Sequence, residues 1–396
     1  MDHTSLPPAD RIAALRPTAV NAILAEVREL QALGADLVSL MRGEPDLPTP
    51  AHIVDACTRS LHAGRTGYPD NRGEMVLREA VAVKLQRDNG LRYDPATEIL
   101  ATTGATFGIH VALTAVLREG GEVLLPDPVY DAYYSPIRLA GGVPRAVRAE
   151  IVDGRFTIPA GALDAAWTPS VQAMILNTPW NPVGTVFTQP ELERIAEFCL
   201  RRGVMLISDE IYETILYEGR RHISPLTAVP ELRNHCICVN SLSKTYSMPG
   251  WRVGYCAGPA ALIQRMFLVL AQSSRGPATF VQDAAAVALT ASQECVAGMR
   301  AEYEARRGTV LAALAGIEGV TVLAPEGGFF AMVDARGLGE PSDRIRRRLL
   351  VEHGVVVAHG AAYGPAGEGT LRVSFASGGG TLERGLARLR TGLVRP

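Results

Sequence analysis

Lys244 has neighbours that would suit a nucleophilic amine beside a bound anion. Ser241 and Ser243 precede it, and Arg252 follows eight residues later. A lysine amine that loses its proton is a nucleophile, and two hydroxyls with a guanidinium beside it would hold an anionic group. Of the 39 basic residues in the chain, only Lys84 and Lys244 are lysines. Because arginine does not deprotonate in proteins, a lysine kept in such a chain indicates chemistry such as a Schiff base.

Three other segments carry polar groups directly after short apolar runs. Asp209 follows the run Val204–Ile207, and a buried carboxylate needs a cation or an N–H partner. Asn181 stands between two prolines that hold the chain extended. The segment Thr102–Thr106 opens a helix, whose free N–H groups and positive dipole end would bind an anion. Ligands of α/β sheets bind at the carboxyl ends of strands, so we expect these groups to surround one concave site with Lys244.

The elements that must position these groups alternate along the chain. The apolar runs expected as buried strands are Val123–Leu125, Ala173–Leu176, Val204–Ile207, Ile237–Val239 and Val253–Cys256. The amphipathic stretches expected as helices are Glu74–Asp88, Thr106–Leu117, Glu191–Arg201 and Ala260–Ala271. This order predicts an α/β fold in which a mostly parallel sheet is sandwiched by helices.

The last quarter of the chain predicts a second, smaller α/β unit. A long helix is expected over Glu294–Leu314, and the tail then alternates again. The strands expected in the tail are Phe329–Val333 and Leu371–Phe375, and the helices are Asp343–Glu352 and Thr381–Leu389. Four arginines within Arg344–Arg348 are expected to form a solvated helix face.

Composition excludes several classes of function. The chain has 396 residues, 39 basic and 41 acidic, and a net charge of −2, so neither a nucleic acid nor a polybasic membrane contact is expected. No apolar run approaches the roughly 18 residues of a membrane span, and Met1–Arg16 lacks the apolar core of a secretory signal. The six cysteines form no CxxC pair; Cys236 and Cys238 are expected on one strand face as buried free thiols. No metal site is expected, and a reducing cytoplasm is the expected compartment.

These segments, in this order, resemble the class I aminotransferases, the fold-type I pyridoxal-phosphate enzymes of the aspartate aminotransferase superfamily. The resemblance rests on Ser-x-Ser-Lys at Ser241–Lys244 with Arg252, on Asn-Pro-x-Gly at Asn181–Gly184 and on Asp-x-x-Tyr at Asp209–Tyr212, and it extends from Arg42 to Ser374. It implies a cytoplasmic homodimer that uses pyridoxal 5'-phosphate to move an α-amino group from an L-amino acid to a 2-oxo acid by a ping-pong cycle. It also implies domain limits: 1–48 and 286–396 for the two parts of a small domain, and 49–285 for the large cofactor-binding domain.

The resemblance assigns roles to individual residues. Lys244 would form the Schiff base and shuttle the proton at the substrate α-carbon, and Asp209 would pair with the protonated ring nitrogen. Asn181 and Tyr212 would hydrogen-bond the phenolic oxygen of the ring, and Tyr130 would stack on it. The cofactor phosphate would be held by Gly104, Ala105, Thr106, Ser241, Ser243 and Arg252, and by Tyr68 of the partner subunit. Arg372 would grip the substrate α-carboxylate as a two-pronged fork, with Gly43 and Asn181 also in contact with the substrate.

Some positions depart from the family pattern or leave alternatives open. Val183 replaces the usual threonine of Asn-Pro-Thr-Gly, which removes a hydroxyl but leaves Asn181 in place. Trp180 either lines the pocket or packs in the core, and His359 either lies at the surface or touches the substrate. Arg275 lies in a loop that relatives send toward the neighbouring active site, where it could pair with an acidic substrate side chain. Substrate choice is also expected to involve the segment near Leu15 and Arg16.

Three alternative functions share part of this pattern. A lyase or cyclase on the same fold would use the same cofactor and the same first half of the mechanism. A non-catalytic regulator that binds the cofactor would need an N-terminal DNA-binding unit, for which there is no room before Gly43. The segment Thr103–His110 resembles the glycine-rich turn of short-chain dehydrogenases, but His110 occupies the place of the third glycine.

Lys84, late in its helix, is expected to face solvent, so that its replacement by arginine would be silent.

Overall fold

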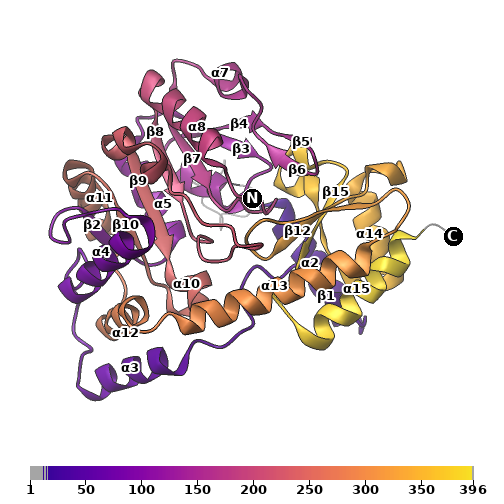
Figure 1. The fold of residues 1–396 in the computed structure, drawn as a ribbon, viewed down its shortest axis with the longest axis horizontal. Coiled ribbons are helices and arrows are strands. Elements are labelled where there is room, and N and C mark those ends of the chain that lie inside the picture. The colour runs from indigo at the N-terminus through magenta and orange to yellow at the C-terminus, as the bar shows by residue number, and fades with distance from the viewer. Residues whose placement is uncertain (1–11, 13–14, 16, 395–396) are drawn as a thin grey trace, which may run out of the picture.

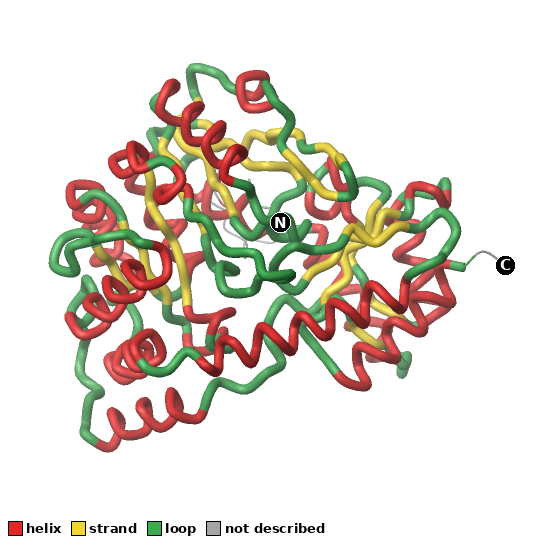
Figure 2. The backbone as a smooth tube through the Cα atoms, in the orientation of Figure 1, coloured by secondary structure: helices red, strands yellow, loops and turns green. Residues whose placement is uncertain are grey.

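The structure is a computed structural model, and it describes residues 12, 15 and 17–394 of the chain. Strands gather in two groups, and helices surround both (Figure 2). Within the described residues, the larger group is a seven-stranded sheet, which we call the large sheet. Its strands in spatial order are β2 (Ile99–Thr102), β10 (Gly254–Ala257), β9 (Cys236–Ser241), β8 (Met205–Asp209), β7 (Val171–Asn177), β3 (Glu122–Asp127) and β4 (Val143–Arg148). Only β10 runs antiparallel to its neighbours, so the prediction of a mostly parallel sheet is confirmed.

Helices cover both faces of the large sheet because its strands are apolar on both sides. Ile237 and Val239 pack toward one face, and Cys236 and Cys238 pack toward the other as free thiols, as predicted. The first face is covered by α5 (Ala105–Val116), α6 (Tyr134–Leu139) and α11 (Ala260–Ser273). The second face is covered by α3 (Ala51–His62), α4 (Met75–Asn89), α8 (Gln189–Arg202) and α12 (Thr279–Thr290). The expected strands and helices of this region therefore all form.

The second group of strands is an antiparallel sheet, which we call the small sheet. Its order is β11 (Thr321–Leu323), β12 (Phe330–Asp334), β15 (Thr370–Ser374) and β14 (Ala358–His359). Its helices are α13 (Glu294–Leu314), α14 (Ser342–His353) and α15 (Gly379–Leu393), and α13 runs toward it from the large sheet (Figure 1). Near the other chain end, α2 (Ala19–Ala32) leads to β1 (Val38–Ser39), which pairs in parallel with β13 (Val355–Val356). Both chain ends thus build the smaller α/β unit, as expected; the domain limits at 48 and 285 stay a prediction.

Short elements complete the fold. β5 (Glu150–Val152) and β6 (Arg155–Thr157) form a hairpin that leads into α7 (Ala162–Ala166), while α9 (Pro225–Ala228) and α10 (Leu242–Thr245) follow later. Single-turn helices occupy Asp131–Tyr133, Pro230–Asn234, Pro249–Trp251, Arg336–Leu338, Gly360–Tyr363 and Pro365–Gly367. Across residues 17–394, no helix is both long and apolar enough to span a membrane.

Two expectations about exposed cations are wrong. Lys84 is only 4% exposed, because it lies on the buried face of α4 with Ala80 and Val81, while Val76 and Val83 lie on the exposed face of the same helix. Arg346, expected on a solvated helix face, is only 2% exposed because it bonds to Glu26 on α2 and to Asp343. The side chains of Arg344 and Arg347 do lie on the exposed face of α14, as expected. The sequence spacing therefore predicted the helix, but not which of its arginines another element covers.

Candidate active site

A cavity of about 730 Å³ opens at the carboxyl ends of β7, β8 and β9. Each of these strands ends in a polar residue that lines it: Asn177, Asp209 and Ser241. The structure brings twelve of the predicted site residues into its wall: Gly43, Ala105, Thr106, Tyr130, Asn181, Asp209, Tyr212, Ser241, Ser243, Lys244, Arg252 and Arg372. Segments from the large sheet, the small sheet and α2 contribute to one site, so the expected convergence on Lys244 is found.

Lys244 lies on α10, one turn after the end of β9. Its Nζ donates a hydrogen bond to the carbonyl oxygen of Gly43 at 2.7 Å and lies 5.6 Å from the centroid of the Phe329 ring. Burial lowers the pKa of Lys244 to about 8, with the guanidinium of Arg252 acting in the same direction. A substantial fraction of the amine is therefore neutral, and nucleophilic, at physiological pH.

Asp209 ends β8 and is only 5% exposed. The hydroxyl of Tyr133 donates to its Oδ2 at 2.5 Å, and the backbone N–H of Ile211 donates to its Oδ1 at 3.3 Å. Burial raises the pKa of Asp209 to about 6, although these two hydrogen bonds act to lower it. A ligand cation beside this carboxylate would remove the cost of its charge. Sequence reasoning missed Tyr133; its only signal was its position three residues after Tyr130.

An anion-binding cradle lies where α5 begins. Among its backbone N–H groups, those of the first turn have no partner within the helix. Arg252 has a left-handed backbone (φ 55°) and donates to the carbonyl oxygens of Pro249 and Thr103 at 3.0 and 3.4 Å. A Cβ on Gly104 would lie 2.6 Å from its Nη2, so glycine is what lets the guanidinium approach the helix start. With the hydroxyls of Ser241 and Ser243 at the same wall, these groups fit a phosphate dianion.

Arg372 lies on β15 between two aromatic rings. Its guanidinium carbon is 4.2 Å from the centroid of Phe330 and 4.7 Å from that of Tyr363. Its Nη2 donates to the carbonyl oxygen of Met41 at 3.1 Å, and its Nη1 lies 3.5 Å from Oδ1 of Asn181. Within the described chain, its buried Nε has no hydrogen-bond partner. A bound carboxylate would supply the missing acceptor.

The remaining walls hold aromatic and amide groups. Tyr212 is buried and meets the rings of Phe329 and Phe330 edge-on. Burial raises the pKa of Tyr212 well above its ordinary value, while a hydrogen bond with Asn181 acts to lower it. Tyr130 packs edge-on against Tyr133, with ring centroids 5.4 Å apart. Phenol and amide thus face the same space as Lys244, as predicted.

Two predicted site residues lie outside the cavity wall. Gly104 stands directly behind it, against Arg252. Tyr68 is 84% exposed and lies beneath the guanidinium of Arg275, 4.9 Å from the centroid of its ring. Neither Tyr68 nor Arg275 lines this cavity.

The positions with open alternatives are now placed. Trp180 is a core residue: its Nε1 donates to the carbonyl oxygen of Pro128 at 2.8 Å, and its ring stacks on Phe187. His359 is half-buried beside Asp343 at 3.2 Å and does not line the cavity. The cavity mouth is lined by α2 and the residue before it, through Thr18, Val20, Asn21 and Leu24. Leu15 precedes them without lining the cavity, and Arg16 lies outside the described residues.

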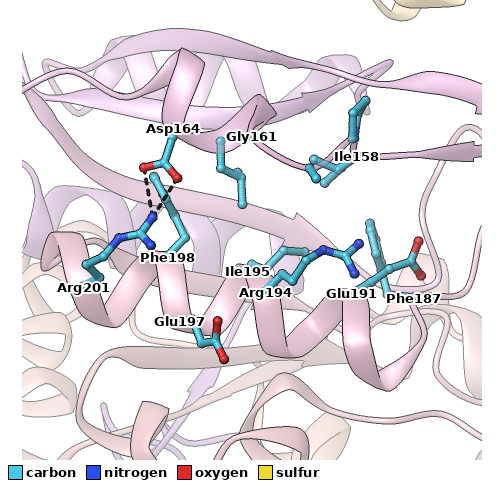
Figure 3. Close-up of a pocket in the computed structure, with 13 residues that line it drawn as sticks. Ile158, Gly161, Asp164, Phe187, Glu191, Arg194, Ile195, Glu197, Phe198 and Arg201 are labelled. Atoms are coloured by element: carbon cyan, nitrogen blue, oxygen red, sulfur yellow. Dashed lines mark hydrogen bonds and ion pairs between the residues drawn. The ribbon is translucent and has the colours of Figure 1, made fainter.

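A second, smaller cavity of about 220 Å³ lies far from this chemistry, between the segment Ile158–Asp164 and α8 (Figure 3). Two of its charged side chains pair with each other: Arg201 donates to both carboxylate oxygens of Asp164, at 2.7 and 2.9 Å. None of the predicted site residues lies there.

An amine of lowered pKa, a buried carboxylate and the side chains of Arg252 and Arg372 line one cavity at the carboxyl ends of parallel strands, an arrangement typical of α/β enzymes. Comparison with known proteins identifies its family. Residues 35–389 match the model of the family described as aminotransferase class I and II. The chain therefore belongs to the class I and II aminotransferases, and the predicted resemblance is confirmed.

Relatives and solved structures agree with this assignment over nearly the whole chain. The aspartate aminotransferase of Geobacillus stearothermophilus is 36% identical over 386 residues, which are 96% of this chain and 97% of the relative. Aromatic-amino-acid aminotransferase 2 of Thermococcus litoralis is 35% identical over 96% of this chain and 97% of its own. The crystal structure of the aspartate aminotransferase from Rhizobium meliloti superposes with a TM-score of 0.94 at 31% identity, covering 98% of this chain and 99% of that one. This protein is accordingly an aminotransferase.

Proposed function

We propose that the protein transfers an α-amino group from an L-amino acid to a 2-oxo acid by a ping-pong cycle, with pyridoxal 5'-phosphate as its cofactor and Lys244 as the covalent attachment point. The observation that carries the proposal is the amine of Lys244, with a pKa lowered to about 8, in one cavity with a buried carboxylate and a phosphate cradle. When bound, the cofactor supplies an aldehyde and a ring that accepts electrons.

The residues that would hold the cofactor follow from the chemistry of each wall. Asp209 would pair with the ring nitrogen, so that its costly buried charge becomes part of an ion pair. Asn181 and Tyr212 would bind the phenolic oxygen, and Tyr130 would stack on the ring. The phosphate is held by Gly104, Ala105, Thr106, Ser241, Ser243 and Arg252, a proposal supported by the close approach of Arg252 to the start of α5.

The chain's own groups bind the substrate and move its proton. Arg372 takes the α-carboxylate, and its unpartnered Nε supports that role. In the cofactor-free protein the Lys244 amine donates to the carbonyl oxygen of Gly43 at 2.7 Å. With the cofactor attached, the substrate amine would take the place of Lys244 and so free its amine. Once free and neutral, Lys244 can take the proton from the substrate α-carbon and return it. The named relatives act on aspartate and on aromatic amino acids, and amino acids of these kinds are the first substrates to test.

We further propose a cytoplasmic homodimer. Tyr68, exposed on this chain and outside its own cavity, is then free to reach the phosphate bound by the partner subunit. Its position supports a site that two chains share.

A panel of L-amino acids with 2-oxoglutarate, read by formation of the new oxo acid, tests the function. Turnover of a donor with a stoichiometric yield of glutamate supports transfer. Ammonia release without an amino acid product would instead favour the lyase or cyclase alternative, and no turnover of any donor would refute transamination.

A further inference from the structure

Below the floor of the cavity lies a buried polar cluster centred on the second lysine. Lys84, from α4, donates from its Nζ to Oε1 of Glu213 and, at 2.7 Å, to Oδ1 of Asn89. The amide of Asn89 donates to Oε2 of Glu213 at 2.9 Å, and that of Asn240 donates to Oε1 at 2.5 Å. All four side chains are buried, so each depends on the others for its hydrogen bonds.

The cluster is attached to both segments that carry the proposed cofactor contacts: residues 209–213, from the last residue of β8 onward, and residues 240–244, from the end of β9 into α10; we call these segments the two site loops. Glu213 directly follows Tyr212, and its own N–H donates to the carbonyl oxygen of Glu210 at 3.0 Å. On the other loop, Asn240 directly precedes Ser241, and its Oδ1 accepts from the Ser241 N–H at 2.7 Å. Through Glu213, the ammonium of Lys84 therefore holds together the loop with Asp209 and Tyr212 and the loop with Ser241, Ser243 and Lys244.

Glu213 also belongs to a neighbouring group of possible metal ligands, with Glu210 and His222, but their hydrogen bonds explain this group without a metal ion. Ligand atoms of Glu210, Glu213 and His222 lie within 4.8 Å of one another. Glu210, however, accepts from Ser208 at 2.9 Å, from Ser224 at 2.8 Å and faces His222 at 2.7 Å. Glu213 is occupied by the Lys84 ammonium, which already supplies a positive charge.

We propose that Lys84 is a positioning residue for the cofactor site, acting through Glu213 on both loops; this inference rests on the proposed function. Removal of the ammonium leaves the Glu213 carboxylate buried without a cationic partner, and the loop with Tyr212 must move to bring it to water. Arginine is a poor substitute, because its larger planar head overfills a cluster built around a compact ammonium with tetrahedral donors.

The test compares Lys84→Met with Arg78→Met in the full-length protein. Arg78 lies on the same helix, is equally buried, and bonds to the carbonyl oxygens of Gly73 and Pro95 rather than to either loop. Both variants should lower the urea midpoint of the apoprotein. Only Lys84→Met should weaken equilibrium binding of pyridoxal phosphate, by about 10–100-fold, if its effect matches that of removing an outer partner of a metal ligand.

Two further variants sharpen the result. Lys84→Met combined with Glu213→Gln removes both charges, so it should bind the cofactor more tightly than Lys84→Met alone. Lys84→Arg keeps the charge and should still bind several-fold more weakly than the wild type, which provides a test if the methionine variant does not fold.

Several results would overturn the proposal: wild-type cofactor affinity in Lys84→Met or in Lys84→Arg, equal losses of affinity in Lys84→Met and Arg78→Met, or no recovery in the double variant. A wild-type protein that binds the cofactor but transfers no amino group would refute the proposed function alone. A wild-type protein that does not bind it would refute both.

Discussion

Replacement of Asp209 by asparagine should make the cofactor-free protein more stable while it weakens cofactor binding. Burial raises the pKa of this carboxyl group to about 6, from an ordinary value of 3.8. At about 1.36 kcal/mol for each factor of ten in proton affinity, the ionised carboxylate costs the apoprotein about 3 kcal/mol at neutral pH. Asparagine keeps an acceptor for the Tyr133 hydroxyl and the Ile211 N–H but carries no charge, so it removes this cost.

The pH dependence of this effect has a definite sign. Because the folded-state pKa of Asp209 is raised, its contribution to stability is fully present below pH 3.8 and is lost as the pH rises through about 6. The free energy of unfolding of Asp209→Asn should therefore exceed that of the wild type by about 3 kcal/mol above pH 7. The two proteins should become equal near pH 4.

Urea unfolding of both apoproteins between pH 4 and pH 8 measures the difference directly, and at neutral pH the Tm should rise by about 4 °C. Asp94→Asn is a control of opposite sign, since hydrogen bonds from Thr97 and Ala96 hold the pKa of Asp94 below its ordinary value. Equal stability of the Asp209 variant and the wild type at pH 7.5, or a difference that persists at pH 4, would refute the reasoning. The same variant should bind the cofactor more weakly. Its lower cofactor affinity reports the functional role of the Asp209 charge, and its higher apoprotein stability reports the structural cost of that charge.

Three further predictions concern the chemistry of the site. Lys244→Arg should abolish turnover and the covalent capture of the cofactor. Capture of the cofactor by the wild-type apoprotein should become faster as the pH rises through about 8, because the neutral amine is the nucleophile. Stopped-flow absorbance measures the capture rate of both proteins. Arg372→Lys should raise the KM for amino donors by about 10–100-fold, since one charged hydrogen bond is worth about 1.5–3 kcal/mol; an unchanged KM would contradict its proposed role. Arg275→Ala should reduce turnover of acidic amino acids more than of neutral ones, and equal losses on both would remove it from substrate recognition.

The fold and most of the site were predictable because both are encoded locally. Apolar runs such as Ile237–Val239 lie in a sheet that is covered on both faces, so their pattern needs no tertiary information. The motif around Lys244 likewise follows directly from the end of β9. The edge strands β2 and β4 were missed: β2 has only four residues, and β4 reads Val-Pro-Arg-Ala-Val-Arg, with the proline and charges that edge strands tolerate.

What could not be predicted depends on which distant element covers a side chain. Tyr133 donates to Asp209 across 76 positions of the sequence, and nothing near either residue encodes the contact. Arg346 was expected in solvent because it belongs to a run of four arginines, but α2, more than 300 residues earlier, supplies its partner. Lys84 was misjudged in the same way, since its acceptor Glu213 lies 129 positions away. Lys84 does stand three and four residues after the apolar Val81 and Ala80, so its helical spacing already indicated burial; the local sequence lacked only the partner of its charge.

The scarcity of lysine now has a physical explanation that covers both residues. Elsewhere in the chain, buried arginines donate hydrogen bonds from one guanidinium group to several acceptors. Arg306, for example, donates to Asp46, to Glu302 and to the carbonyl oxygen of Ala376. In the proposed mechanism Lys244 cannot be replaced by arginine, because its amine must lose a proton. Lys84 has no such chemistry, but its buried ammonium donates to the carboxylate of Glu213 and the amide oxygen of Asn89, with Asp88 4.0 Å away, and we propose that a compact ammonium suits this cluster better than a guanidinium. The two lysines thus resist replacement for different reasons, and Lys84→Arg should weaken cofactor binding although it leaves the amine of Lys244 unchanged.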